Sequence, residues 1–257
     1  MKKLFIILLL ILGIPTFCKT INGEITKQSK KDTNQIYDAQ TNLPLENVIV
    51  KIPSKNYYTK TKKDGSFKLQ TQINAPTIMA LEKNGYKPYS MTIGTNLNSP
   101  INIGIEKTTP KDIIVETDMV HIGDDSFSKK SANANDFCLK SVGAFYTKDF
   151  NVKNINKSEN LFLIIGSIIG IDTLEAQRLG QSGVLTAYSS PPELYFNGNK
   201  ISDIKINGDN QRIKIPSELV KQNQINNVTL KTGHNLYKVS SIDYDDIEFT
   251  NLMFEIK

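Results

Sequence analysis

The sequence predicts an all-β fold of two β-sandwich domains, a small sandwich followed by a larger one. Apolar residues recur at every second position in many short segments, as they do on the buried face of a strand. Asp-Gly and Asn-Gly turn signals separate these segments, about one turn every ten residues. Helical periodicity is scarce. Short strands between frequent turns are typical of β-sandwiches.

The first residues have the layout of a secretory signal. Residues 1–3 are charged, residues 4–14 are apolar, and residues 15–19 are a polar exit. We expect residues 1–18 to be a signal peptide, residues 19–33 to be a polar linker, and the mature chain to be exported, whether secreted, periplasmic or at the cell surface. The apolar run is too short for a mature transmembrane helix, and we expect no other membrane-spanning segment.

Cys18 raises the question of a lipid anchor, because a lipidated cysteine directly follows an apolar signal. The residue before it is Phe17, where lipidation needs a small side chain, so plain cleavage near Cys18 or Thr20 is favoured. If Cys18 leaves with the signal, Cys138 is the only cysteine and no internal disulfide forms. The apolar cores must then supply the stability.

The chain after the linker alternates as a series of strands. Residues 47–52 and 67–69 each place apolar side chains on one face, and Asp64-Gly65 between them predicts a turn. Residues 101–105 form a further half-buried strand. The polar stretch 107–112 is predicted as a domain boundary. We therefore expect a first domain at residues 34–106 and a second at residues 111–257.

One set of residues in the first domain matches a known pattern. Its members are Asp38, Thr41, Pro44, Leu45, Val48, Val50, Asp64, Gly65, Phe67 and Leu69, followed by Gly85-Tyr86. This pattern resembles the carboxypeptidase regulatory-like domain. The resemblance implies a small transthyretin-like sandwich that is not itself an enzyme and serves as a spacer or support.

The second domain continues with similar signals. Asn197-Gly198 and Asn207-Gly208 lie between alternating segments and predict hairpins. Residues 173–179 are the best helix candidate, with Asp172 or Thr173 as N-cap and Gly180 as its end.

The last strand changes phase along its length. Ile247 and Phe249 share one face, whereas Leu252, Phe254 and Ile256 alternate in the opposite phase. A regular strand would place the second set in water. We therefore expect a β-bulge at Thr250-Asn251 that returns the second set to the core.

Four short segments carry a second resemblance. They are residues 121–127 and 243–249, with residues 196–201 and 226–230 between them. With these, residues 111–257 loosely resemble galactose-binding-like jelly rolls, the architecture of many carbohydrate-binding modules. The resemblance implies a larger jelly-roll sandwich.

Two pairs of carboxylates are the sharpest chemical feature. The first and last strands of a jelly roll are often neighbours, so Asp124-Asp125 and Asp245-Asp246 are expected to converge. Oxygen ligands from two segments are what Ca²⁺ requires, and these four residues are therefore the candidate ligands of a structural Ca²⁺. The alternative is that they are loop aspartates that make turns and capping bonds. A glycosidase dyad is a further alternative, although nothing fixes the separation of the carboxylates.

Composition argues against several partners and activities. The formal net charge is +5, and nearly all the basic residues are lysines. Those at 51–68 are interpreted as solvent-facing strand positions, with a patch for an anionic surface as the alternative. Nucleic acid is not an expected partner, because there is neither an arginine cluster nor a recognisable module. Residues 168–176 resemble a strand of thermonuclease-type nucleases, but only Arg178 and Arg212 are available to clamp a phosphate.

Function is predicted as non-catalytic binding. His121 and His234 are the only histidines, and no nucleophile-elbow motif is present. The expected ligand is a carbohydrate or another cell-envelope component, bound by the C-terminal jelly roll. Tyrosines must supply the stacking platforms because tryptophan is absent, and the available ones are Tyr58, Tyr86, Tyr188, Tyr195, Tyr237 and Tyr244. The alternatives are a structural or protein-interaction module and, less favoured, a hydrolase of glycoside or nuclease type.

Overall fold

The computed structural model describes residues 33–95, 100–128, 137, 139–153, 155–156, 158–184, 189–235 and 242–257. The predicted signal peptide, Cys18, the predicted linker up to residue 32, and Cys138 lie outside these residues. Within them almost all of the regular secondary structure is β-strand, which confirms the predicted all-β class. No helix in this part has the length and apolar character that crossing a bilayer requires.

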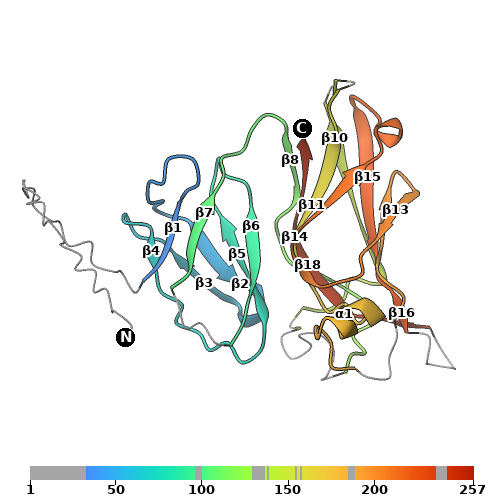
Figure 1. Cartoon of the computed structure of the whole chain (residues 1–257), viewed down its shortest axis with the longest axis horizontal. Coiled ribbons are helices and arrows are strands. Elements are labelled where there is room, and N and C mark those ends of the chain that lie inside the picture. The colour runs from blue at the N-terminus through green and yellow to red at the C-terminus, as the bar shows by residue number, and fades with distance from the viewer. Residues whose placement is uncertain are drawn as a thin grey trace, which may run out of the picture. The chain divides into compact units, whose positions relative to one another are not determined.

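The first group of strands forms two facing sheets (Figure 1). One sheet has the order β4-β1-β7 and the other has the order β3-β2-β5-β6. Between them lies an apolar core centred on Ile36, Val50, Phe67 and Leu81. The elements are β1 (Asn34–Asp38), β2 (Ile49–Ile52), the 3-10 turn η1 (Pro53–Lys55), β3 (Tyr57–Lys60), β4 (Ser66–Phe67), β5 (Thr77–Glu82), β6 (Tyr89–Ile93) and β7 (Asn102–Ile105).

Asp38 anchors the turn after β1. Its Oδ1 accepts hydrogen bonds from the backbone N–H groups of Gln40 and Thr41, both at 2.9 Å, and its Oδ2 accepts one from the hydroxyl of Tyr86 at 2.8 Å. The bond from Thr41 is the largest cause that holds the pKa of Asp38 well below its usual range. This network gives a physical reason for the Asp-Ala-x-Thr segment and for the distant Gly-Tyr pair.

Gly65 shows why the turn before β4 needs glycine. Its φ is +73°, and a Cβ there would collide with the carbonyl of Ile36. The turn joins β3 in one sheet to β4 in the facing sheet, so the two strands beside Asp64-Gly65 do not pair with each other. The sequence pattern located the turn, but it could not show that the chain changes sheets there.

The second group of strands also forms a sandwich around its own core. Its sheets have the orders β10-β15-β12-β13 and β14-β11-β18-β8, and β9 also pairs with β18. Aromatic packing is central in this core, because Phe150, Phe196 and Phe254 lie in mutual ring contact.

The bounds of the second group follow. Its first strands are β8 (Asp112–Glu116), β9 (Val120–Ile122), β10 (Phe145–Val152) and β11 (Leu161–Ile169). The helix α1 (Leu174–Arg178), β12 (Glu193–Phe196), β13 (Asn199–Asp203), β14 (Gly208–Ile215) and the 3-10 turn η3 (Ser217–Leu219) come next. The last strands are β15 (Gln224–Lys231), β16 (His234–Asn235), β17 (Asp243–Tyr244) and β18 (Ile247–Ile256).

Two of the local structures predicted for this group, a helix and a hairpin, are confirmed. The helix is confirmed, with Thr173 as its N-cap and Gly180 in a left-handed conformation after it. The hairpin at Asn197-Gly198 is also confirmed, because β12 pairs with β13 and both turn residues have positive φ.

The hairpin predicted at Asn207-Gly208 is wrong. Strand β14 pairs with β11 rather than with β13, so the chain crosses from one sheet to the other at this point. Asn207 is buried, and its side chain bonds the backbone N–H and C=O of Ile171 at 2.8 and 2.9 Å. Its amide acts as a substitute strand partner and not as a turn residue.

Strand β18 does change phase where predicted. Ile247, Phe249, Leu252 and Phe254 all belong to the same core, and Asn251 takes a left-handed φ of 59° between them. The pairing with β11 keeps its register across Asn251, whereas the pairing with β8 shifts between Leu252 and Met253. The inward phase is therefore restored, but the register shift lies beyond the predicted Thr250-Asn251 position.

The outer face of the sheet β14-β11-β18 is covered by β6 of the first group. Thr92 donates its backbone N–H to Asp209 at 2.9 Å, and Ser167 donates its hydroxyl to the same carboxylate at 2.7 Å. Lys87 Nζ lies 2.5 Å from Glu255 Oε1. Residues 32–257 form one compact unit that contains two apolar interiors. Whether the two sandwiches fold as separate domains stays a prediction.

Candidate functional site

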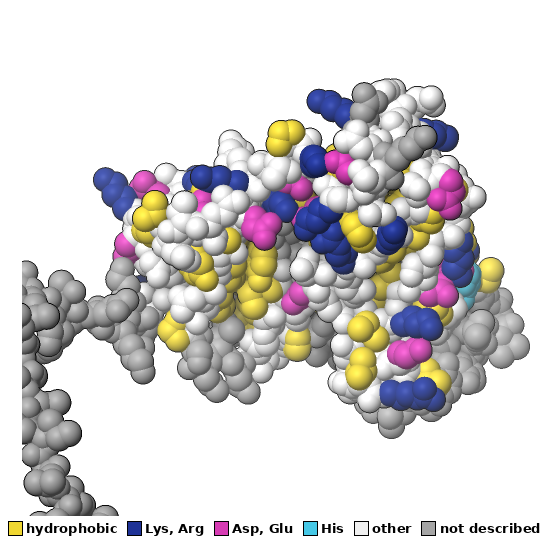
Figure 2. Space-filling model, turned by 45° about the horizontal axis from the view of Figure 1, so that its top comes forward, with side chains coloured by type: hydrophobic (Ala, Val, Ile, Leu, Met, Phe, Trp, Pro, Cys, Tyr) yellow, Lys and Arg dark blue, Asp and Glu magenta, His cyan; other side chains and the backbone are white. Residues whose placement is uncertain are grey.

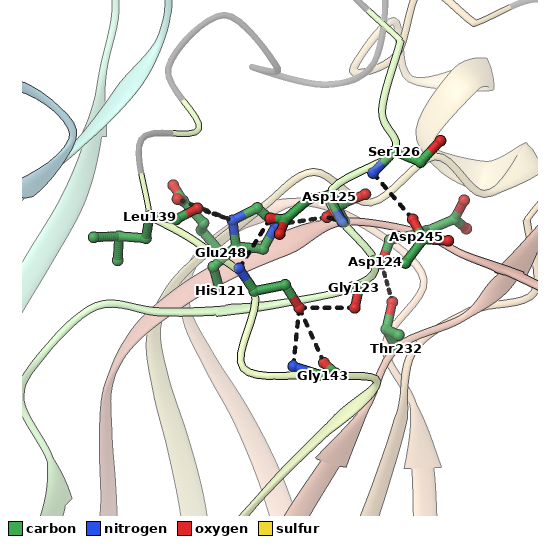
Figure 3. Close-up of polar contacts among 12 residues, drawn as sticks. His121, Gly123, Asp124, Asp125, Ser126, Leu139, Gly143, Thr232, Asp245 and Glu248 are labelled. Atoms are coloured by element: carbon green, nitrogen blue, oxygen red, sulfur yellow. Dashed lines mark hydrogen bonds and ion pairs between the residues drawn. The ribbon is translucent and has the colours of Figure 1, made fainter.

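Two loops that are far apart in the sequence meet at one end of the second sandwich (Figure 3). The backbone N–H of Asp125 donates to Asp246 Oδ1 at 2.9 Å, so the loop after β9 and the loop before β18 touch directly. A left-handed φ of 62° at Asp125 turns the first loop, and Asp125 Oδ1 accepts the backbone N–H of Ser141 at 2.9 Å. The predicted convergence of the two acidic pairs is therefore present at Asp125 and Asp246.

His121 lies beneath these loops, fully buried. One ring nitrogen, Nδ1, lies 2.7 Å from the carbonyl oxygen of Leu139, and the other, Nε2, lies 2.7 Å from Asp246 Oδ1. A carbonyl and an ionised carboxylate can only accept, so this geometry favours an imidazolium that donates from both nitrogens. Burial by itself lowers the pKa of His121, but these two hydrogen bonds and the nearby charge of Glu248 outweigh it and raise that pKa.

At Asp245, in contrast to His121, the surroundings disfavour the charged form of the side chain. Burial is the largest cause that raises the pKa of Asp245 to about 7, and the neighbouring carboxylates of Asp172, Asp243 and Asp246 act in the same direction. Asp246 Oδ2 is buried and has no hydrogen-bond partner within the described residues, and the same holds for Asp245 Oδ2. Carboxylate oxygens that are gathered, buried and unpaired in this way are suited to a cation.

The four predicted ligands therefore have different environments. Asp246 is buried and Asp245 is half-buried near Asp172 and Asp243, whereas Asp125 is exposed and donates its backbone N–H to Asp246. Asp124 is also exposed, and its Oδ1 accepts the backbone N–H of Ser126 at 3.0 Å, as in a simple Asx-turn. The loop-aspartate alternative describes Asp124 well, and it does not describe Asp245 or Asp246.

Sequence reasoning did not name two carboxylates that the fold adds. Asp172 follows β11 and is buried, and Asp243 lies on β17, two residues before Asp245. In the sequence, Asp172 stood out only as a candidate helix N-cap and as part of the segment that resembles nucleases, and neither signal placed it near Asp245. No local pattern could bring β11 and β17 together, because that depends on the crossing of the sheets.

The donor set favours a hard cation over a transition metal. His121, Asp125 and Asp246 place one ligand atom each within 4.8 Å of one another. A metal on His121 Nε2 would have to displace the 2.7 Å hydrogen bond between this nitrogen and Asp246 Oδ1. The unpaired oxygens of Asp245 and Asp246 require no such displacement, and oxygen ligands suit Ca²⁺.

A second feature is a groove of about 570 Å³ on the outer face of the sheet β3-β2-β5. Tyr57 and Tyr58 line it, and Tyr58 is 70% exposed. Thr117, Asp118, Met119 and Leu139 close it from the second group. The groove joins an exposed aromatic ring to a mainly apolar lining with a few polar side chains, which is the usual character of a small-molecule site.

The charges in the groove balance one another. Lys51, Lys60, Glu82 and Asp118 all line the groove, and Lys51 Nζ lies 2.5 Å from Glu82 Oε1. On the face drawn in Figure 2, basic and acidic side chains are likewise interspersed and do not form a broad patch of one sign. An uncharged ligand fits this groove better than a strongly charged one.

The other candidate tyrosines are placed differently. Tyr86 and Tyr195 each donate their hydroxyl to a neighbouring carboxylate, Asp38 and Glu193, both at 2.8 Å. Tyr244 packs on the ring of His234, with ring centroids 4.9 Å apart. Tyr188 and Tyr237 lie outside the described residues. Of the tyrosines that the structure describes, Tyr58 offers the most exposed stacking surface.

Comparisons with known proteins do not assign this chain to a family. No protein-family model and no curated protein matches the chain. One similar solved structure is the crystal structure of a BuGH86 variant in complex with neoagarooctaose, with 11% identity and a TM-score of 0.31. The match covers 89% of this chain and 28% of the other, so this chain spans less than a third of that protein. A similarity this weak does not bear on function.

Proposed function

We propose that this protein is an exported, non-catalytic binding protein whose ligand is a carbohydrate of the cell envelope. The observation that carries the proposal is the groove with the exposed ring of Tyr58. A sugar ring has an apolar face that stacks on an aromatic ring and hydroxyl groups that bond to polar side chains, and the groove offers both kinds of surface. Export rests on the signal layout of residues 1–18.

The proposal moves the binding site away from the C-terminal jelly roll. Most of the groove belongs to β2, β3 and β5, and the second group contributes only residues 117–119 and 139. The first sandwich is then more than a spacer, because it carries the stacking platform. The second sandwich closes one wall.

The test is a comparison of two exposed aromatic residues on a glycan array and by calorimetry. Tyr58→Ala removes the platform and should weaken glycan binding about tenfold or more, because a stacked aromatic contributes about 1–2 kcal/mol. Phe145→Ala is the matched control, because Phe145 is 61% exposed and lies outside the groove. Equal affinities for wild type and Tyr58→Ala would overturn the proposal.

A structural or protein-interaction role is the competing function. It is favoured if no glycan binds and if a protein partner is lost with Tyr58→Ala. A hydrolase would show turnover of a glycan or a nucleic acid that Asp245→Asn or Asp172→Asn abolishes.

In addition to the binding groove, we propose a separate site for a structural Ca²⁺, held by Asp245 and Asp246. The support is the buried, unpaired Oδ2 of each residue, together with the neighbouring carboxylates of Asp172 and Asp243. A divalent cation would relieve the repulsion among them and fasten the loop before β18. Addition of Ca²⁺ should then raise the melting temperature, and chelation should lower it.

A further inference from the structure

The groove that carries Tyr58 extends well beyond this ring. The strand register places Tyr58 on β3 opposite Lys51 on β2, and Lys51 opposite Ala80 on β5. All three residues line the groove. Because neighbouring strands lie about 4.8 Å apart, β3 and β5 are separated by about 10 Å. A sugar ring stacked on Tyr58 therefore leaves room for a substituent that reaches across β2.

The part of the groove beyond Tyr58 is lined mainly by apolar side chains. Ile49 and Ala80 form its floor on β2 and β5. Met119 and Leu139 close it from the second group. A plain hexose uses its apolar face in stacking on Tyr58, and its hydroxyl groups would lose hydrogen bonds to water against such a lining. The lining therefore favours a sugar that carries an apolar substituent.

The charged side chains of the groove favour a neutral substituent. Lys51 and Glu82 neutralise each other, because Lys51 Nζ lies 2.5 Å from Glu82 Oε1. Lys60, on β3, and Asp118, from the second group, are both exposed in the groove and carry opposite charges. They offer an ammonium donor and a carboxylate acceptor. A neutral group that has a donor and an acceptor can bond to either side chain without bringing a net charge into the groove.

An acetamido group combines these properties. Its N–H donates and suits the carboxylate of Asp118, and its C=O accepts and suits Lys60 or the side-chain amide of Asn56, which also lines the groove. Its methyl group is apolar and suits Met119 and Leu139. The groove volume of about 570 Å³ lies within the range of about 300–1,000 Å³ that holds drug-sized ligands, so a disaccharide fits.

We propose that the groove selects oligosaccharides of N-acetylated amino sugars, and that Met119 and Leu139 determine this preference by receiving the acetamido methyl group. This inference rests on the proposed function, because it names the class of glycan that the groove holds. Tyr58 supplies affinity for any sugar ring, whereas the apolar wall from the second group supplies the selectivity. The two roles can be separated by experiment.

The test compares two disaccharides with the same linkage. N,N′-diacetylchitobiose carries an acetamido group on each ring, and cellobiose carries a hydroxyl group at the same position. In calorimetry on the full chain, the acetylated disaccharide should bind about tenfold more tightly or better, because burial of a methyl group and new hydrogen bonds add to the stacking. Chitobiose, which carries free amines, should bind less tightly than its acetylated form, because each amine brings a charge.

Met119→Ser tests the source of the selectivity. It should reduce the preference to about threefold or less and leave the affinity for cellobiose unchanged, because serine removes apolar wall and not the stacking ring. Leu139→Ser should have the same effect, so the test does not depend on a single variant. Ile225→Ser is the matched control and should keep the full preference, because Ile225 is 63% exposed and lies outside the groove.

Equal affinities for cellobiose and its acetylated counterpart, both lost in Tyr58→Ala, would overturn this inference and leave the proposed function standing. Tighter binding of chitobiose would overturn it too, because the groove would then select a charge. A preference that survives in both Met119→Ser and Leu139→Ser would show that this wall does not determine it. The absence of all glycan binding, on the array and in calorimetry, would overturn the proposed function and this inference with it.

Discussion

At the scale of single residues, Asp245 and Asp246 bring two negative charges close together in the loop before β18. Each has a buried oxygen without a hydrogen-bond partner in the described part of the chain, and burial and neighbouring charge keep the pKa of Asp245 high. Protonation of Asp245 relieves part of this repulsion, and a bound cation would relieve more of it. The two possibilities differ in their response to metal.

The residue-scale prediction concerns Asp246→Asn. In wild type, saturating Ca²⁺ should raise the melting temperature by about 5–10 °C over the chelated protein, from a stabilisation of about 3 kcal/mol at a hundredfold excess over Kd. Asp246→Asn replaces a charged ligand and should lose most of this difference. Differential scanning calorimetry with Ca²⁺ and with chelator measures it.

Asp124→Asn is the control for this variant. Asp124 belongs to the predicted set of ligands, but the structure places it in a surface turn, so its variant should keep the full response to Ca²⁺. A wild-type melting temperature that is the same with Ca²⁺ and with chelator would eliminate the cation site. The protonated form of Asp245 would then be the remaining explanation.

Some residues of the candidate site could be predicted from the sequence, and others could not. Asp124-Asp125 and Asp245-Asp246 were visible as pairs, and the contact between Asp125 and Asp246 follows from the neighbouring first and last strands. Asp172 was not recognisable as their neighbour, because it reaches them only through the packing of β11 within the sandwich. Asn251 was marked by the phase change in β18, but nothing local showed that its side chain faces another sandwich.

At the scale of elements, the contact between Lys87, before β6, and Glu255, on β18, gives the fold an acid-sensitive point. Burial by itself would raise the pKa of Glu255, but hydrogen bonds from Lys87 and Lys257 outweigh it and lower this pKa to about 2. A folded-state pKa below the unfolded one stabilises the fold above the unfolded value of 4.5. That stabilisation is lost as pH falls from about 4.5 to about 2.

We therefore expect the free energy of unfolding to fall by about 1–3 kcal/mol over this pH range because of Glu255. Glu255→Gln should be less stable than wild type at pH 7 and should show a flatter profile in acid, measured by urea unfolding at a series of pH values. Glu46→Gln, at an exposed position, should keep the wild-type profile. Parallel profiles for wild type and Glu255→Gln would show that this contact carries none of the pH dependence.

The strands also show where the alternation of apolar and polar residues predicts burial and where it is not sufficient. Alternation placed Ile101, Ile103 and Ile105 on a buried face correctly, because one face of β7 meets the core and the other does not. Strand β11 is a nearly continuous apolar run, and its outer face is covered by β6. The sequence shows that such a run is buried on both faces, but it does not show which element covers the second face.

At the scale of the whole molecule, the two interiors are connected through a polar seam. Asp209 is central to it, because it accepts the backbone N–H and the hydroxyl of Thr92 and the hydroxyl of Ser167. Hydrogen bonds to a charged group contribute about 1.5–3 kcal/mol each at most, and less where water competes. We therefore expect the seam to couple the unfolding of the two sandwiches.

Asp209→Ala tests this coupling in the full chain. Wild type should unfold in one calorimetric transition, and the variant should lose about 2 kcal/mol and separate into two transitions. Asp149→Ala, at an exposed position on β10, is the control and should keep a single transition. Two well-separated transitions in the wild type would instead show that each sandwich unfolds independently.

The complete burial of β18 has a consequence for what proteolysis of this chain would leave behind. All ten of its residues are buried, and Met253 and Ile164 face the first sandwich rather than water. A protease that cut the connection near residue 109 and released the first sandwich would expose the apolar outer face of β11 and β18. We expect such a remnant to aggregate with other copies of itself through this exposed apolar surface.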